Sequence, residues 1–280
     1  MSYHQPTRGL QEPNYQSALF LAAICSQTYV QFANKETGAF IKPEHYDLVG
    51  SIMTSELGID HDRYGFVLAS EQNTILAFRG SSTSIDWVYD FIAQQTEYLP
   101  NKNAGQTHKG FTDIYYTLRQ QVMELLSHCN ADHPLYITGH SLGGALATLA
   151  ALDIASNTSF HAPIVYTFGA PRVGDPAFVR TYNYTVPVNW RFQNKYDIVP
   201  HLPTLVYHSP QTDETYFYLH VKGEVQRSFR HGSVSANHIM SSYFQDLADD
   251  MPDIAQSICS SPLGFCPVEE TIKQAAHTKE

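Results

Sequence analysis

The chain has 280 residues, of which 43% are hydrophobic and 16% are charged, a composition typical of a globular protein with a sizeable core. The formal net charge is −10, with 17 Lys and Arg residues against 27 Asp and Glu residues. This acidic balance provides no positive surface for nucleic acid or for an anionic membrane, so we expect no nucleic-acid partner.

The N-terminus and the cysteines leave the compartment of the protein open. Residues 1–6 are polar, without a basic stretch followed by an apolar one, and no apolar run is long enough to span a bilayer. We expect a chain that is either leaderless or already without its signal. Cys25 lies in an apolar helical run and is expected to be a buried thiol. Cys259 and Cys266 are close enough to close a small loop, but sequence alone does not decide whether they are bridged.

The N-terminal part is expected to form a long helix followed by a hairpin. Apolar residues recur with helical spacing over residues 14–34, and Asn14 is a suitable cap. Residues 42–59 are ambiguous. Residues 65–70 and 74–78 each have the composition of a strand, and the polar turn between them predicts a hairpin.

A polar loop at residues 79–84 follows the second strand and leads into an apolar segment. Residues 85–92 have helical spacing, and Ser84 is a candidate cap for that helix. A longer helix is expected over residues 108–128, where apolar residues recur three and four positions apart.

The next segment carries the strongest chemical signal. A short apolar run at residues 135–138 predicts a strand, and the Ala- and Leu-rich residues 145–154 predict a helix. Between them lies the G-x-S-x-G pentapeptide of residues 139–143, with Ser141 at its centre. Alone, such a pentapeptide can be a glycine-rich turn that happens to contain a serine. A strand before it and a helix after it favour a nucleophile on a sharp turn, beside the free N–H groups of the helix.

Strands and helices continue to alternate beyond this turn. The further expected elements are strands at 163–168 and 188–193, a short helix at 175–182, a loop at 194–200, an alternating strand at 215–225 and a helix at 235–247. Residues 249–280 are rich in proline and polar residues, so we expect an appended segment rather than an independent domain. Residues 1–248 are then a single domain.

This alternation predicts an α/β fold with a mostly parallel central sheet and helices on both faces. In such sheets the active site lies beyond the carboxyl ends of the strands. Ser81, Ser141 and Asp197 each come just after a predicted strand. We therefore expect them to meet at one edge of the sheet, although they are far apart in sequence.

Several motifs in this order resemble those of the fungal-type, or class 3, lipases, a branch of the α/β-hydrolases. The matching segments are Phe78-Arg79-Gly80-Ser81-Ser82, Trp87 with Asp90, His108-Lys109-Gly110-Phe111, Thr138 to Ala145, Thr167 to Gly174, Asn194 to Pro200, and Asn237-His238 followed by Tyr243-Phe244. The resemblance covers roughly residues 15–248 and excludes the tail. It implies an α/β-hydrolase fold with a helical lid. It also implies secretion, although the disulfides of many secreted members are missing.

A nucleophilic serine needs a base within hydrogen-bond reach and a carboxylate that orients the base, in the chain order Ser, Asp or Glu, His. Ser141 is the proposed nucleophile. Asp197 follows a strand and matches the family's Asp-Ile-Val-Pro, although a loop-capping role is the alternative. His238 is assigned as the base because its context resembles the family's, with His231 as the alternative. His220 is set aside because it falls in the expected strand at 215–225.

The oxyanion hole is expected to use two backbone N–H groups. One is that of Leu142, directly after the nucleophile, and the second is that of Ser81, whose alternative is an ordinary turn serine. By analogy with the family, Asp90 or Tyr29 would hold Ser81 in place. For Tyr29, a place in the core of the first helix is the favoured interpretation.

The segment 85–92 is interpreted as a lid. Trp87, Val88, Phe91 and Ile92 make it too apolar for a freely exposed surface helix. The alternative is a buried core helix. Its position directly after the expected oxyanion loop favours a helix that covers the site in water and rolls back at a lipid surface.

Together these features predict a triacylglycerol lipase or carboxylesterase that works through an acyl-Ser141 intermediate. No metal or organic cofactor is required. The expected partners are an acylglycerol or other ester and, transiently, a lipid–water interface, with no obligate protein partner evident. The alternatives are a phospholipase A1 or galactolipase, a feruloyl-type esterase and, with least support, a lipase-like binding domain without catalysis. A serine protease with the same triad is chemically possible but remote.

Overall fold

The computed structural model describes residues 12–54, 62–81, 93–209 and 213–267. Its centre is a seven-stranded sheet in the order β1-β2-β3-β6-β7-β8-β11. The bounds of these strands are β1 Asp47–Met53, β2 Arg63–Ala69, β3 Thr74–Phe78, β6 Leu135–His140, β7 Ile164–Phe168, β8 Val188–Asn194 and β11 Glu224–Arg227. The β1–β2 and β2–β3 pairs are antiparallel, and all later neighbours are parallel. The predicted α/β fold with a mostly parallel sheet is thus confirmed.

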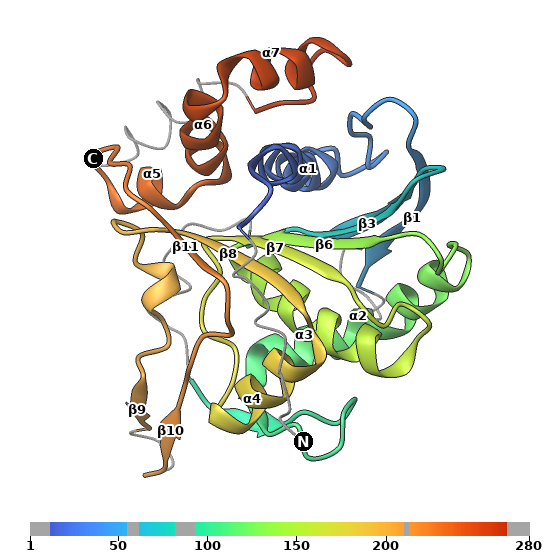
Figure 1. The fold of residues 1–280 in the computed structure, drawn as a ribbon. Helices are drawn as coiled ribbons and strands as arrows, with labels where there is room; N and C mark the ends of the chain where they lie inside the picture. The colour runs from blue at the N-terminus through green and yellow to red at the C-terminus, as the bar shows by residue number, and fades with distance from the viewer. Residues whose placement is uncertain (1–11, 55–61, 82–92, 210–212, 268–280) are drawn as a thin grey trace, which may run out of the picture.

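Helices cover both faces of this sheet (Figure 1). On one face lie α1 Tyr15–Ala33, α6 Met240–Asp250 and α7 Pro252–Ser260, and on the other lie α2 Lys109–Ser127, α3 Leu142–Asn157 and α4 Pro176–Thr185. In the described part of the chain, no helix is both long and apolar enough to cross a membrane.

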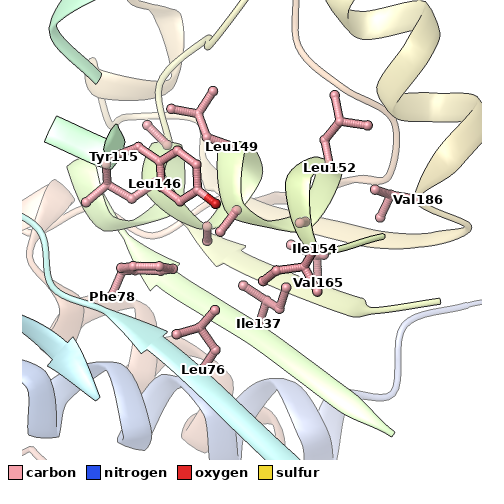
Figure 2. Packing of buried hydrophobic residues seen from close by; sticks show 14 of the residues in the cluster. Leu76, Phe78, Tyr115, Ile137, Leu146, Leu149, Leu152, Ile154, Val165 and Val186 are labelled. Carbon is pink, nitrogen blue, oxygen red and sulfur yellow. The ribbon is translucent and has the colours of Figure 1, made fainter. Parts of the chain in front are cut away.

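The core follows from the two-residue period of the central strands. In β3, Leu76 and Phe78 point to the side of α2 and α3, whereas Ile75 and Ala77 point to the side of α1. Figure 2 shows the first of these layers, in which Leu76, Phe78 and neighbouring strand residues pack beneath the leucines of α3. Burial on both faces explains why these strands are almost continuously apolar.

The structure corrects one expected strand and resolves one ambiguity. Within the ambiguous residues 42–59 lies β1. The single strand expected at 215–225 is instead divided into β10 Thr215–Phe217, which pairs with β9 Val206–His208, and β11, which joins the central sheet. Gly223 lies between them with φ +84°, and a Cβ there would be 1.6 Å from the Asn189 carbonyl oxygen. The turn at Gly223, which packs closely against Asn189, therefore interrupts the single alternating strand that was expected. A second short ribbon, β4 Gln95–Glu97 with β5 Gln106–His108, was not predicted.

The helix expected at 235–247 is also divided, into α5 Val234–His238 and α6. Ile239 between them is extended, with φ −59° and ψ 149°. After α7, a disulfide joins Cys259 and Cys266. Cys25 is a buried free thiol, as predicted.

Candidate active site

Ser141 occupies the sharp turn between β6 and α3, with φ 57° and ψ −126°. Such a positive φ is unusual for a residue with a side chain and is typical of a functional turn. A Cβ at Gly139 would lie 2.1 Å from the Gly143 carbonyl oxygen, and one at Gly143 would lie 2.3 Å from that of Phe78. The strand and helix can therefore approach each other only because both flanking positions are glycine.

The side chains of Ser141, His238 and Asp197 form one hydrogen-bonded chain. His238 Nε2 lies 2.8 Å from Ser141 Oγ, and His238 Nδ1 lies 2.7 Å from Asp197 Oδ2. All three side chains are buried, and they come from three separate segments of the chain. The structure thus brings together the three residues that the sequence proposed as nucleophile, base and carboxylate.

Asp197 is held by further donors on both of its oxygens. It follows β8 and precedes a short 3₁₀ turn, Val199–His201, whose Val199 N–H donates to Oδ1 at 2.9 Å. Tyr243 of α6 donates its hydroxyl hydrogen to Oδ2 at 2.7 Å. Burial, and then the charge of Asp197, raise the pKa of Tyr243 well above its ordinary value, so the phenol keeps its proton and donates. These contacts orient a carboxylate that can only accept.

His238 reaches Ser141 because the last helix is interrupted. It is the final residue of α5, and the extended Ile239 redirects the chain into α6. In an uninterrupted helix, five residues correspond to about 500° of rotation, or about 140° beyond one full turn. The side chains of His238 and Tyr243 would then lie on different faces of the helix. With the break, both side chains contact Asp197.

The alternative histidines are engaged elsewhere. His220 lies between β10 and β11 rather than within a strand, and its Nε2 hydrogen-bonds the Pro200 carbonyl oxygen at 2.6 Å. The His231 ring lies beside Phe229. Within the described ranges, the His, Cys, Asp and Glu side chains form no group of three that could hold a metal ion.

The two expected oxyanion donors belong to segments that adjoin Ser141. Leu142 is the first residue of α3, so its N–H is one of those that a helix leaves without an intrahelical acceptor. A Cβ at Gly80 would be only 3.0 Å from Ser141 Cβ, which brings the loop containing Ser81 against the nucleophile. Arg79, which the sequence did not single out, donates to the Gly80 carbonyl at 2.6 Å and lies over the Phe32 ring at 3.9 Å. The only sequence signal for this anchor is its place in the Phe-Arg-Gly-Ser motif.

Two expectations concern residues next to this loop. The phenol oxygen of Tyr29 lies 2.6 Å from His140 Nδ1, so the side chain is a polar contact of the pentapeptide rather than simply a core aromatic. Asp90 and the whole segment 85–92, with Trp87, Val88, Phe91 and Ile92, lie outside the described residues. The lid therefore stays a prediction.

When the sequence is compared with known proteins, the matching family model and the matching fungal relatives are all lipases. The model of the family described as lipase (class 3) matches residues 75–207. A lipase of Rhizomucor miehei is 36% identical over 157 residues, which is 53% of this chain and 42% of that protein. A secreted mono- and diacylglycerol lipase A of Penicillium cyclopium is 33% identical over 175 residues, 60% of this chain and 53% of that protein. The chain thus spans about half the length of the curated relatives it matches.

Solved structures share the fold over more of the chain. Lipase II from Rhizopus niveus superposes with a TM-score of 0.60 at 27% identity, covering 76% of this chain and 80% of that one. A triacylglycerol lipase whose catalytic centre is described as a serine protease triad gives a TM-score of 0.61 at 28% identity, covering 75% and 78%.

Proposed function

The chain belongs to the class 3 lipase family, and from this premise we propose that it hydrolyses carboxylic esters of acylglycerols. The observation that carries the proposal is the hydrogen-bonded chain from Ser141 through His238 to Asp197. A serine hydroxyl is a weak nucleophile at neutral pH, and this arrangement is the one that activates it.

The reaction follows from the directions of these hydrogen bonds. Ser141 Oγ attacks the ester carbonyl carbon and passes its proton to His238 Nε2, while Asp197 stabilises the imidazolium that forms. The tetrahedral intermediate then collapses, and His238 returns the proton to the leaving alcohol. A water molecule, deprotonated by His238, attacks the acyl carbonyl carbon, and His238 passes that proton to Ser141 Oγ as the carboxylic acid leaves. The first of these proton transfers joins Ser141 Oγ and His238 Nε2, which already lie within hydrogen-bond distance.

The oxyanion of both intermediates is assigned to the backbone N–H groups of Leu142 and Ser81. The positive end of α3 adds to the first of these donors. Loss of one such donor typically lowers kcat by about 10²–10³-fold, so this pair is an important part of the barrier reduction.

Relatives favour acylglycerols and leave one alternative with specific support. The fungal relatives are named lipases, or mono- and diacylglycerol lipases. However, a chloroplastic phospholipase A(1) of Arabidopsis thaliana is 33% identical over 163 residues, 51% of this chain and 36% of that protein. Hydrolysis of a phospholipid acyl ester by the same site is therefore the second candidate.

The test is hydrolysis of tributyrin below and above its solubility limit, with Ser141→Ala as control. We expect ester cleavage by the wild-type chain and a fall in kcat on the order of 10⁶-fold in the variant, because the covalent step is lost. A steep rise once droplets form would support the lid at 85–92. Activity saturated below the limit would indicate an esterase without one.

Substrate choice is measured in the same assay with triolein, monoolein and phosphatidylcholine presented in matched emulsions. Preferential release of fatty acid from triolein or monoolein supports the acylglycerol proposal. Preferential release from phosphatidylcholine would replace it with the phospholipase. No cleavage of any ester, including p-nitrophenyl butyrate, would refute both.

A further inference from the structure

His140, which precedes Ser141 in the pentapeptide, is a buried polar side chain that the mechanism above does not use. It is 3% exposed. Its Nδ1 lies 2.6 Å from the phenol oxygen of Tyr29, and its Nε2 lies 2.6 Å from the backbone carbonyl oxygen of His238. Both ring nitrogens are thus engaged, one with helix α1 and the other with the residue assigned as the base.

The direction of each hydrogen bond is fixed by chemistry. A carbonyl oxygen can only accept, so His140 Nε2 carries the hydrogen, and Nδ1 of the neutral ring accepts from the phenol of Tyr29. Burial, and then the neighbouring His238, lower the pKa of His140 well below its ordinary value. Burial also raises the pKa of Tyr29. The ring therefore stays neutral and the phenol keeps its proton.

The His238 carbonyl needs a donor from outside its helix. Carbonyl groups in the last turn of a helix have no intrahelical partner, and His238 ends α5. The extended Ile239 directs the chain away at that point. His140 supplies the donor, with the two imidazole rings 4.7 Å apart between centroids. This contact fixes the backbone of the residue whose ring joins Ser141 to Asp197.

The other end of the chain of contacts reaches the oxyanion loop. The backbone of Gly80 lies directly against the phenol of Tyr29. A Cβ at Gly80 would lie 2.3 Å from the phenol oxygen, so only glycine allows this approach. Gly80 directly precedes Ser81. Two hydrogen bonds therefore join Tyr29 through His140 to the backbone of His238, and Tyr29 packs against Gly80 at the other end.

We propose that Tyr29 and His140 are positioning residues that hold the backbone of His238 in fixed relation to Ser141. The inference rests on the proposed function. It assigns the pair no contact with substrate. Its effect is to keep the distance from His238 Nε2 to Ser141 Oγ constant while the imidazole gains and loses its proton.

The first test compares Tyr29→Phe with Tyr182→Phe. Each change removes one phenol oxygen, and the buried Tyr182 donates to Asn189 Oδ1 at 2.6 Å on the opposite face of the sheet. For p-nitrophenyl butyrate we expect Tyr29→Phe to lower kcat about 10- to 100-fold with KM within about twofold, because small misplacements of catalytic groups cost this much. Tyr182→Phe should leave kcat at the wild-type value.

The second test compares His140→Gln with His140→Leu. Glutamine keeps an N–H donor for the His238 carbonyl and leucine does not, so the glutamine variant should retain at least about tenfold more kcat. A p-nitrophenyl phosphonate modifies Ser141 once and is not turned over. Its rate of reaction therefore measures how far each variant lowers the reactivity of Ser141, and we expect the leucine variant to react more slowly than the glutamine variant. Circular dichroism checks the fold, and the tyrosine pair decides the question if a His140 variant does not fold.

The outcomes separate the inference from the function on which it rests. A wild-type chain that neither cleaves esters nor reacts with the phosphonate would refute the proposed function. An active wild type in which Tyr29→Phe matches Tyr182→Phe, or in which the two His140 variants match each other, would refute the positioning role alone.

Discussion

At the residue scale, the contacts of Asp197 explain how a buried carboxylate is tolerated. Its oxygens accept from His238, Tyr243 and Val199, and it is 1% exposed. Burial of a charge is costly unless hydrogen bonds replace its hydration, and these donors provide that replacement. Tyr243 also accepts from the Asn194 N–H at 3.0 Å, so one phenol connects the carboxylate to the end of β8.

Because Tyr243 donates to the charged carboxylate of Asp197, its hydroxyl should stabilise the fold more than that of a buried tyrosine with a neutral acceptor. We expect Tyr243→Phe to lower the free energy of unfolding by about 1.5–3 kcal/mol, the range for hydrogen bonds to charged groups. The control is Tyr98→Phe, which loses a bond of 2.7 Å to the neutral Leu149 carbonyl and should cost about 0.5–1.5 kcal/mol. Urea denaturation measures both. Equal losses would mean that the charge of Asp197 contributes nothing through Tyr243.

At the element scale, the site depends on how closely β6 and α3 meet and on where the last helix breaks. The prediction of Ser141 rests on a local signal, a strand, a turn and a helix, whereas that of Asp197 rests chiefly on the resemblance, with its place after a strand in support. The sequence predicts His238 only through resemblance, since nothing in Ser-Ala-Asn-His-Ile-Met indicates an interruption at Ile239.

Partners that are distant in sequence escape prediction for a physical reason. The contact from Tyr243 to Asp197 spans 46 positions and that from His140 to His238 spans 98. No local pattern encodes such a pair, because neither side chain differs in spacing or composition from a core residue. The divided strand at 215–225 was missed for a related reason, since only the approach of Gly223 to Asn189 makes the turn necessary.

The β6–α3 contact gives a prediction for Gly139. A Cβ there meets backbone atoms of Gly143, which cannot yield without moving the helix. We expect Gly139→Ala to lower the free energy of unfolding by about 3 kcal/mol, at the upper end for overpacking. A Cβ at Gly232 would have no atom within 4 Å. Gly232→Ala should therefore lower the free energy of unfolding by only about 1 kcal/mol, the cost of placing alanine at a φ of +81°. Chemical denaturation measures the stability of both variants. The prediction is wrong if Gly232→Ala proves less stable than Gly139→Ala.

At the scale of the whole molecule, the segment after α6 is fastened to the first helix. Gln27 of α1 donates its side-chain amide to the carbonyl oxygens of Gly264 and Phe265. Phe265 is 1% exposed and its ring lies 5.8 Å from that of Phe20. The disulfide between Cys259 and Cys266 closes the loop that presents this aromatic side chain. We propose that the segment after residue 248 is an appendage that stabilises one domain rather than a second folding unit.

Removal of this disulfide should therefore lower the stability of the domain without changing the activity of the folded protein. The double change Cys259→Ser and Cys266→Ser should lower the free energy of unfolding by about 2–4 kcal/mol. Ester hydrolysis by the folded fraction should be retained, because the loop packs against Gln27 and Phe20 of α1 rather than against the Ser141 site. Cys129→Ser, at a free and half-buried thiol, is the matched control and should leave stability nearly unchanged. A comparable loss in that control would refute the role of the bridge.

The pairing of α1 with α6 and Phe265 also sets an order of events during synthesis. Translation proceeds from the N-terminus at about 5–20 residues per second, so α1 leaves the ribosome roughly 10–40 seconds before its covering helix. For that time Ala18, Leu19, Leu21 and the other apolar residues of α1 lack their final cover. The nascent chain thus carries an open hydrophobic surface until α6 and Phe265 have been translated and can cover it.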